Sequence, residues 1–247
     1  MDLEGECAIV TGGTRGIGRA VALALAREGC DVAINYRKSD KEAQDLIAQI
    51  KEMGRAAMAV KADVARYEDA ENMFKAVLER FGHLEILVNN AGINWDSVIW
   101  KMSEEQFDAV IATNLKGCFN YNKLAAIHFK DQRHGKIVNI SSINGLRGKF
   151  GQTNYSASKG GEIALTKALA KELGKFNINV NCVCPGMVRT EMAEQIPREF
   201  LDRAIDETVL GRIAEPEDIA NVVVFLCSEK ARHITGEVIK VDGGQYI

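Results

Sequence analysis

The sequence of 247 residues contains only three prolines and no stretch rich in proline, glycine and serine. Linkers between domains usually have such a composition, so nothing marks a domain boundary. No internal repeat divides the chain either. A chain of this length is sufficient to bury one large hydrophobic core. We therefore predict a single domain over residues 1–247.

Charge of one sign does not predominate, because 31 Lys and Arg residues stand against 34 Asp and Glu residues, a formal net charge of −3. Binding to nucleic acid or to anionic membrane surfaces usually requires a basic excess. No segment approaches the roughly 20 apolar residues of a membrane span, and the N-terminus shows no basic, then apolar, leader. We expect a cytoplasmic protein that acts on small molecules and binds neither nucleic acid nor membrane.

Patterns typical of metal sites and disulfide frameworks are also missing. Six cysteines are scattered mostly through apolar runs, the closest pair reads C-V-C, and the four histidines are isolated from one another. Zinc sites need Cys and His residues at short, regular spacings. We therefore predict no metal site, and we interpret the cysteines as small buried apolar side chains that stay reduced.

What the sequence does contain is a regular alternation of short apolar runs and longer segments with helical periodicity. Strands are predicted near residues 8–10, 31–36, 57–60, 86–89, 136–140, 179–183 and 238–241. Helices are predicted near residues 16–28, 41–53, 67–81, 103–129, 155–176 and 216–228. The strands are apolar throughout, as expected when both faces are buried. This pattern predicts the α/β class: a doubly wound Rossmann-type domain with a seven-stranded parallel sheet and helices on both faces.

One region, residues 187–213, departs from the alternation. It is charged and amphipathic and lies between the sixth predicted strand and a helix whose first turn contains Pro216. Two interpretations stay open. The region is either a lid over the substrate or a helical hairpin on the surface.

A glycine-rich turn, T-G-G-T-R-G-I-G, follows the first predicted strand and leads into a helix. Small residues there let backbone N–H groups approach a pyrophosphate at the helix N-terminus, and Gly18 lets helix and strand pack closely. No Gly-Lys-Ser or Gly-Lys-Thr follows, so a mononucleotide P-loop is not indicated. We predict a dinucleotide site here. The predicted contacts from this turn are Gly12, Thr14, Arg15, Gly16, Ile17 and Gly18.

The second predicted strand bears on which dinucleotide binds. An NAD site places a carboxylate at the C-terminal end of this strand, but Asp31 lies at its start and Arg37 follows its end. A cation at a helix N-terminus, such as Arg15, is opposed by the helix dipole unless an anion lies beside it. Arg15 and Arg37 together are suited to hold a 2′-phosphate. We predict a preference for NADP(H), with NAD(H) as the alternative cofactor. The alternative interpretation of Arg15 and Arg37 is that both are simply solvated.

Seven short motifs occur in order along the chain. They are T-G-G-T-R-G-I-G, D-V at residues 63–64, N-N-A-G at 89–92, T-N-L-K-G around Asn114, S-S-I-N-G from Ser141, Y-S-A-S-K at 155–159 and P-G-M-V-R-T at 185–190. Together they resemble the short-chain dehydrogenase/reductase family. Within that family the chain is most similar to the β-ketoacyl-acyl-carrier-protein reductases, through A-G-I-N-W-D-S-V-I-W-K-M, R-H-G-K-I and F-L-C-S-E-K-A-R-H-I-T-G-E.

The resemblance implies a role for each matching residue. A catalytic tetrad is implied at Asn114, Ser142, Tyr155 and Lys159. Asp63 would bond the adenine, and Val188 and Thr190 would hold the nicotinamide carboxamide. The remaining implied cofactor contacts are Val64, Asn89, Ala91, Gly92, Pro185 and Gly186, together with Tyr155 and Lys159 themselves.

The pair Tyr155 and Lys159 also has a chemical rationale of its own. Residues four apart in a helix share a face, so the two side chains are expected side by side. An ammonium stabilises phenolate, and we expect Lys159 to lower the pKa of Tyr155 from about 10 toward the working pH, so that Tyr155 acts as a general acid. By the resemblance, Ser142 would donate to the substrate oxygen, and Asn114 would hold a water that restores the proton.

The expected function is the NADPH-dependent reduction of a β-ketoacyl thioester, linked to acyl carrier protein or coenzyme A, to the 3-hydroxyacyl product. An alternative is an NAD(P)-dependent dehydrogenase of a secondary or cyclic alcohol or of a hydroxyacyl-CoA. A non-catalytic dinucleotide sensor is a further alternative, but a mere binder has no need of the phenol. Trp95 and Trp100 either line a bulky apolar pocket or serve packing or a subunit contact. The resemblance also implies a homotetramer.

Overall fold

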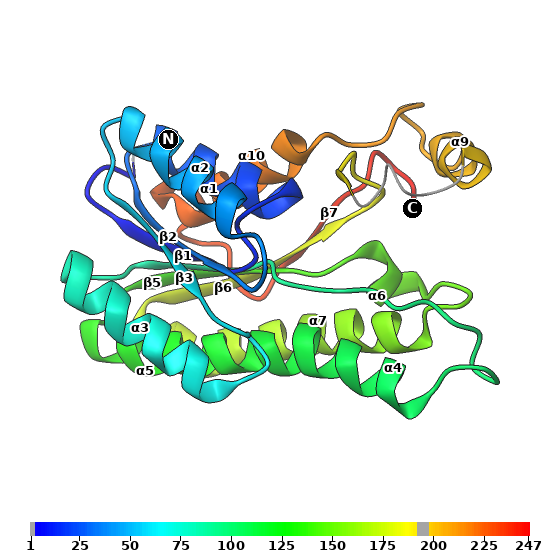
Figure 1. Ribbon diagram of the computed structural model, residues 1–247, viewed down its shortest axis with the longest axis horizontal. Helices are drawn as coiled ribbons and strands as arrows, with labels where there is room; N and C mark the ends of the chain where they lie inside the picture. Colours follow the sequence, from blue (N-terminus) through cyan, green and yellow to red (C-terminus); the bar gives the residue numbers. More distant parts are fainter. Residues whose placement is uncertain (1–2, 192–197) are drawn as a thin grey trace.

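The computed structural model describes residues 3–191 and 198–247, and a parallel sheet lies at its centre (Figure 1). The order of the seven strands found in the described residues is β3-β2-β1-β4-β5-β6-β7. They are β1 (Cys7–Val10), β2 (Asp31–Tyr36), β3 (Ala57–Lys61), β4 (Ile86–Asn89), β5 (Gly135–Ile140), β6 (Ile178–Pro185) and β7 (Val238–Val241). The predicted fold class and all seven predicted strands are confirmed, with some ends shifted by one or two residues.

Helices cover both faces of the sheet (Figure 1). One layer contains α1 (Gly16–Arg27), α2 (Asp40–Glu52) and α10 (Pro216–Cys227), and the other contains α3 (Tyr67–Phe81), α5 (Gly117–Gln132) and α7 (Thr153–Leu173). Side chains alternate between the faces of a strand. In β1, Ala8 and Val10 join one buried apolar cluster and Cys7 and Ile9 join the other. The strands are therefore apolar throughout because each face packs against helices.

The long helix predicted over residues 103–129 is wrong as a single element. It divides into α4 (Glu104–Val110), a π-helical segment η1 (Ile111–Lys116) and α5. A Cβ added to Gly117, the first residue of α5, would lie 2.7 Å from Val64 Cγ2, so the helix passes close to the loop after β3. A π-helical turn keeps the apolar pattern of the sequence nearly continuous. The pattern therefore does not reveal that the helix is interrupted.

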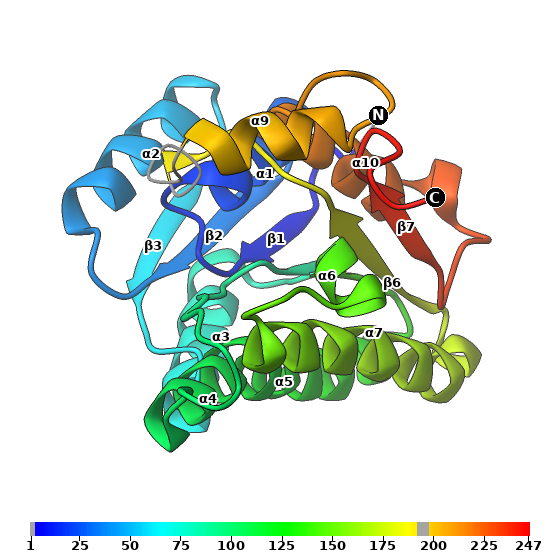
Figure 2. The same ribbon diagram turned by 90° about the vertical axis from the view of Figure 1, so that its right-hand side faces the viewer.

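Two further helices lie at the edge of the sheet that faces the viewer in Figure 2. They are α6 (Ile143–Arg147), which follows β5 and was not predicted, and α9 (Arg198–Asp206), which lies in the region interpreted as either a lid or a helical hairpin. Short 3-10 turns, η2 (Gly174–Phe176) and η3 (Glu229–Ala231), follow α7 and α10. Because α9 belongs to the predicted lid region 187–213 and residues 192–197 lie outside the described residues, the choice between lid and hairpin stays open.

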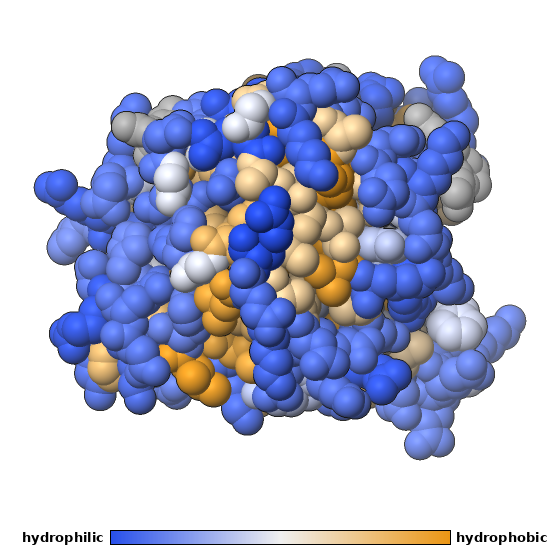
Figure 3. All heavy atoms as spheres, turned by 60° about the vertical axis from the view of Figure 1, so that its left-hand side comes forward, coloured by the Kyte–Doolittle hydropathy of each residue, from blue (hydrophilic) through white to orange (hydrophobic). Residues whose placement is uncertain are grey.

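The surface is mainly polar, with local exceptions. Figure 3 shows one face on which apolar side chains gather near the middle, divided and surrounded by hydrophilic ones. Contiguous apolar patches commonly mark contact surfaces. Across residues 3–191 and 198–247, no helix combines the length and apolarity that crossing a bilayer demands.

Packing between α5 and the start of β5 offers a test of the fold. Phe129 is fully buried, and its ring lies so close to Gly135 that a Cβ added there would be 2.3 Å from the ring. We expect Phe129→Ala to lower the free energy of unfolding by about 3–5 kcal/mol, because it leaves a cavity. Phe150→Ala, at a site 82% exposed, should change it by less than about 0.5 kcal/mol. Urea denaturation followed by circular dichroism measures both, and equal losses would contradict this packing.

Candidate active site

The predicted site residues gather at the C-terminal edge of the sheet. The glycine-rich turn follows β1, N-N-A-G begins at the last residue of β4, Ser142 follows β5, and Pro185 ends β6. The strand order runs outward in both directions from β1 and β4, which are neighbours. In open α/β sheets the crevice at such a switch point binds ligands. The sheet thus brings segments far apart in the sequence to one crevice.

The glycine-rich turn folds tightly against the start of α1. Gly12 has φ +63° and donates its N–H to Asn35 Oδ1 at 2.9 Å. A Cβ added to Gly18 would lie 2.3 Å from the carbonyl oxygen of Gly12 and 2.4 Å from Asn90 Nδ2. The turn also meets the segment after β6, since a Cβ on Gly16 would lie 3.1 Å from Thr190 Cγ2. Only glycine allows this approach at Gly18.

The N-terminus of α1 has the chemistry of an anion site. Arg15 occupies the N-cap without a side-chain capping bond, and the first turn contains no acid. The first N–H groups of a helix have no partner within the helix, and the dipole favours negative charge beside them. A dinucleotide pyrophosphate therefore fits this end of α1.

Basic side chains lie at the adjoining strand ends. Arg37 Nη1 lies 3.5 Å from Asp63 Oδ2, and Asp63 Oδ1 accepts from the N–H of Ala65 at 3.0 Å. Arg37 and Arg15 are both exposed at this edge. The structure therefore places Arg37, a predicted phosphate-binding residue, beside Asp63, the predicted adenine-binding residue.

The N-N-A-G segment is fastened to the end of β1. The N–H groups of Asn90 and Ala91 both donate to Thr11 Oγ1, at 2.9 and 3.0 Å, and Asn90 Nδ2 donates to the carbonyl oxygens of Thr11 and Gly12. The Asn89 amide donates to Asn139 Oδ1 at 2.9 Å, inside the sheet. The roles predicted for Asn89, Ala91 and Gly92 toward the nucleotide stay predictions, and Thr11 and Asn90 are structural residues that the sequence reasoning missed.

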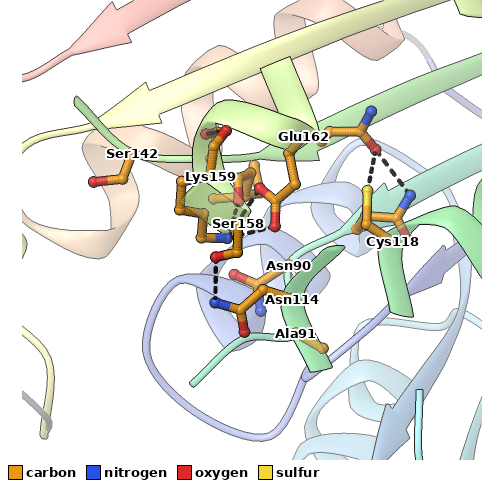
Figure 4. A network of polar contacts seen from close by, with 12 residues as sticks. Asn90, Ala91, Asn114, Cys118, Ser142, Ser158, Lys159 and Glu162 are labelled. Atoms are coloured by element: carbon orange, nitrogen blue, oxygen red, sulfur yellow. Dashed lines mark hydrogen bonds and ion pairs between the residues drawn. The ribbon is translucent and has the colours of Figure 1, made fainter. Parts of the chain in front are cut away.

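Asn114 lies in the π-helical segment η1 and is fully buried. Its side chain accepts from the N–H of Ile93 at 2.8 Å and donates to Ile93 O at 2.9 Å and to Ser158 Oγ at 3.0 Å (Figure 4). It therefore ties the loop after β4 to α7. π-Helical turns occur frequently at functional sites. The proton-relay role expected for Asn114 stays a prediction.

The ammonium of Lys159 is bound by the side chain of Glu162 and by the end of β5. Lys159 Nζ donates to Ile140 O at 2.8 Å and to the two carboxylate oxygens of Glu162 at 2.9 and 3.0 Å. The same Nζ lies 5.8 Å from the centroid of the Tyr155 ring. Both side chains of the ion pair are almost completely buried, with 5% and 2% exposed for Lys159 and Glu162.

The pKa of Tyr155 is raised above its ordinary value, contrary to the expected direction. Burial is the largest cause, the charge of Lys159 opposes it, and the charge of Glu162 adds to the rise. A side-chain hydrogen bond with Ser142 lowers the pKa to a smaller extent. Burial and the negative charge of Glu162 therefore raise the pKa of Tyr155 more than the ammonium of Lys159 lowers it.

The ion pair beneath Tyr155 has shifted pKa values of its own. Burial raises the pKa of Glu162 to about 7, and the charge of Lys159 opposes part of that rise. Burial disfavours the charge on Lys159, yet the facing carboxylate holds its pKa above the usual value. Sequence reasoning missed Glu162. The available signal was an acid three residues after Lys159, on the same helical face, in the stretch K-G-G-E-I-A-L.

Ser142 caps the short helix α6, where its Oγ accepts from the N–H of Asn144 at 3.1 Å. It lies apart from the Lys159–Glu162 pair in Figure 4. A polar chain that the sequence reasoning missed adjoins it: Asn144 donates to Gln152 Oε1 at 3.1 Å, and Gln152 donates to Asp96 Oδ2 at 2.8 Å. These side chains offer donors and acceptors beside the phenol.

Within the described ranges, no three His, Cys, Asp or Glu residues are grouped in a way that suits a metal ion. All six cysteines are free and buried, which confirms their interpretation as small apolar side chains.

Comparison with known proteins agrees with the motifs. Residues 12–245 match the family described as Enoyl-(Acyl carrier protein) reductase. The chain belongs to the short-chain dehydrogenase/reductase family. It is 44% identical over 242 residues to the 3-oxoacyl-acyl-carrier-protein reductase FabG of Staphylococcus aureus strain Mu50, with 98% of both chains covered.

Two further members of the short-chain dehydrogenase/reductase family are similar over nearly their whole length. The acetoacetyl-CoA reductase of Shinella zoogloeoides is 45% identical over 241 residues, covering 97% of this chain and 98% of its own. The FabG reductase of Thermotoga maritima is 40% identical over 247 residues, covering both chains completely. The protein is therefore an oxidoreductase, and the predicted family is confirmed.

The close approach at Gly18 generates a prediction. We expect Gly18→Ala to lower the free energy of unfolding by about 1–3 kcal/mol and to weaken dinucleotide binding, because the added Cβ meets backbone. Gly174→Ala is the matched control, since a Cβ there meets nothing within 4 Å and its φ of −56° suits alanine. It should be neutral or stabilise by less than about 1 kcal/mol.

Thermal denaturation and quenching of intrinsic fluorescence by NADPH measure stability and binding in the two glycine variants. Full cofactor affinity in Gly18→Ala would contradict the tight turn.

Proposed function

We propose that the protein is an NADPH-dependent reductase that converts β-ketoacyl thioesters, linked to acyl carrier protein or coenzyme A, to 3-hydroxyacyl products. The observation that carries the proposal is the position of Ser142 directly after β5 and of Lys159 Nζ against Gly92 in the N-N-A-G loop, both at the C-terminal edge of the sheet. The chain's relatives bear the names 3-oxoacyl-acyl-carrier-protein reductase and acetoacetyl-CoA reductase.

Ser142, Tyr155 and Lys159 have separate roles in the proposed reaction. A nicotinamide dinucleotide, when bound, supplies the hydride. Ser142 Oγ donates to the carbonyl oxygen, on which negative charge develops. Tyr155 holds its proton because its pKa is raised, and it donates that proton to the same oxygen as the general acid. The nearby ammonium of Lys159 then stabilises the phenolate that remains.

NADP(H) is the proposed cofactor, and the end of β2 supports it. Asn35 is buried, accepts from Gly12 N–H and donates to Ala62 O at 2.6 Å, so its side chain is committed to the fold. No carboxylate in β2 stands where NAD sites hold the ribose hydroxyls, because Asp31 lies at the opposite end. Arg15 and Arg37 provide the positive charge for a 2′-phosphate.

The remaining parts of the proposal concern the surroundings of the site. The acyl carrier protein is the proposed partner, the cytoplasm the proposed location, a homotetramer the proposed assembly, and residues 187–213 the proposed lid. Trp95 and Trp100 are both exposed, and the carbonyl oxygen of Trp95 accepts from Asn154, the neighbour of Tyr155 in the chain, which keeps a cyclic-alcohol dehydrogenase as the second candidate. A sensor that binds the dinucleotide without turnover has no need of a proton donor, so the arrangement of Tyr155, Ser142 and Lys159 argues against that alternative.

Substrate choice tests the proposal. Oxidation of NADPH should be rapid with a β-ketoacyl carrier protein or acetoacetyl-CoA and slow with cyclic ketones. Tyr155→Phe should lower the rate of reduction by about 100-fold to 10,000-fold, because the general acid is lost, while NADPH still binds. Nicotinamide absorbance follows turnover, and fluorescence quenching follows binding. Brisk reduction of cyclic ketones without thioester turnover would favour the second candidate, and an unchanged rate in Tyr155→Phe would remove the mechanism.

Cofactor selectivity gives a separate test. Arg37→Ala should raise the KM for NADPH by about 10-fold to 100-fold and leave the KM for NADH nearly unchanged, because it removes a charge-assisted bond to the 2′-phosphate. Arg27→Ala is the control, since Arg27 is exposed at the opposite end of α1. Equal effects of Arg37→Ala on both cofactors would argue against NADP(H) selectivity through this residue.

A further inference from the structure

The short helix α6 begins directly after Ser142 and depends on contacts with other segments. It contains only five residues, and isolated helices of that length are marginal at best in water. Ser142 caps its first turn, and its middle rests on α7, since a Cβ added to Gly145 would lie 2.7 Å from the carbonyl carbon of Lys159. Its last residue is Arg147, and Gly148 with φ +70° ends the helix. The contacts that hold this end therefore bear on where Ser142 lies.

Arg147 joins the end of α6 to two other segments. Its Nη2 donates to Glu207 Oε2 at 3.3 Å, and its Nη1 donates to the carbonyl oxygen of Gln245 at 3.4 Å. Glu207 follows α9, and Gln245 belongs to the C-terminal segment, which ends at the same edge of the sheet as α6 and α9 (Figure 2). Only 26% of the Arg147 side chain is exposed. We call Arg147, Glu207 and Gln245 together the C-terminal junction.

The side chain of Gln245 extends the C-terminal junction to the end of β6. Its Nε2 donates to Glu207 Oε2 at 3.2 Å, and its Oε1 accepts from the N–H of Met187 at 3.1 Å. A Cβ added to Gly186 would lie 2.7 Å from the same Oε1. Gly186 belongs to the P-G-M-V-R-T segment, which is a predicted cofactor contact. The C-terminal junction therefore borders the predicted cofactor site as well as α6.

Close backbone packing brings Glu207 and Gln245 together. The N–H of Leu210 donates to the carbonyl oxygen of Gly243 at 3.1 Å. A Cβ added to Gly243 would lie 2.6 Å from Thr208 Cγ2, and a Cβ added to Gly244 would lie 2.9 Å from Val209 Cβ. The two glycines let the C-terminal turn approach the residues after α9. Arg147 therefore binds a pair of acceptors whose proximity does not depend on Arg147 itself.

Asn144 connects the C-terminal junction to Ser142. Arg147 Nε donates to Asn144 Oδ1 at 3.4 Å, and the backbone N–H of Asn144 donates to Ser142 Oγ at 3.1 Å. Asn144 also donates to Gln152, which in turn donates to Asp96 in the loop after β4. The segment that begins with Ser142 is thus hydrogen-bonded on one side to this loop and on the other side to the C-terminal segment.

We propose that Arg147 is a positioning residue that, through Asn144, holds Ser142 where its hydroxyl donates to the substrate oxygen. The proposal rests on the proposed function, in which Ser142 stabilises the negative charge that develops on that oxygen. Glu207 is 43% exposed, and an ion pair at such a site contributes little to stability. Placement is the stricter requirement, because a displacement of about 1 Å can lower a rate by about 100-fold. The C-terminal segment thereby influences the reaction from outside the predicted catalytic set.

Hydrogen exchange tests the placement of α6 without any substrate. Backbone hydrogen bonds close the turns of α6, and a peptide spanning residues 141–151 reports on them. In Arg147→Ala, the amides of this peptide should exchange about 3-fold to 5-fold faster than in the wild type, because the end of the helix is released. Lys75→Ala is the control, since it breaks an exposed ion pair with Glu71 on α3 and should leave this peptide unchanged.

Steady-state kinetics tests the effect on Ser142. For any carbonyl compound that the wild type reduces, Arg147→Ala should lower kcat by about 10-fold to 100-fold, because Ser142 acts on charge that develops in the transition state. The affinity for NADPH, followed by fluorescence quenching, should stay unchanged, because Gln245 still binds Met187. A general loss of structure would lower both quantities. Arg147→Lys keeps the charge and should retain more of the wild-type kcat, and Lys75→Ala should retain all of it.

Exchange of the two charges provides a second variant if Arg147→Ala folds poorly. Arg147→Glu and Glu207→Arg should each lower kcat, and the double variant should recover part of that loss, because residues in contact act together. A double variant no faster than Arg147→Glu would overturn the proposal.

The two readouts also separate this proposal from the proposed function. Unchanged exchange in the peptide over residues 141–151, or an unchanged kcat in folded Arg147→Ala, would overturn the role of Arg147. Thioester reduction at the wild-type rate by Arg147→Ala would support the proposed function alone. Faster exchange together with slower reduction of a cyclic ketone, in a protein that reduces no thioester, would support Arg147 and contradict the proposed function.

Discussion

The buried contact between the Lys159 ammonium and the Glu162 carboxylate is the constraint around which the active site is arranged. Removing both groups from water leaves each dependent on the other for its charge. The ammonium held in this contact lies 5.8 Å from the centroid of the Tyr155 ring. Burial raises the pKa of Tyr155 above its ordinary value, the charge of Lys159 opposes that rise, and the charge of Glu162 adds to it.

In the rest of the site, separate loops are hydrogen-bonded to one another as well as to the sheet. Thr11 Oγ1 receives two N–H groups of the loop after β4, and Asn114 joins that loop to α7. Parallel strands place these loops at one edge, and the hydrogen bonds fix their spacing.

Much of this architecture was accessible from the sequence. Continuous apolar runs predicted strands buried on both faces, and ordered motifs placed Gly12, Ser142 and Tyr155 at one edge. The break of the helix over residues 103–129 was not accessible, because the approach of Gly117 to Val64 is a tertiary contact. The pKa direction of Tyr155 was missed for a related reason: helical spacing places Lys159 nearby, but only the fold shows that Tyr155 is buried and that Glu162 lies close to the ammonium.

The side chain of Asn35 has a consequence for redesign of the coenzyme pocket. Its oxygen anchors the first glycine of the turn and its nitrogen anchors Ala62, so the terminus of β2 is already part of the turn's scaffold. Installing an acid there to attract the unphosphorylated adenosine ribose would detach that scaffold. Substitutions intended to change the preference from NADP(H) to NAD(H) should therefore be made at the exposed residues that follow β2.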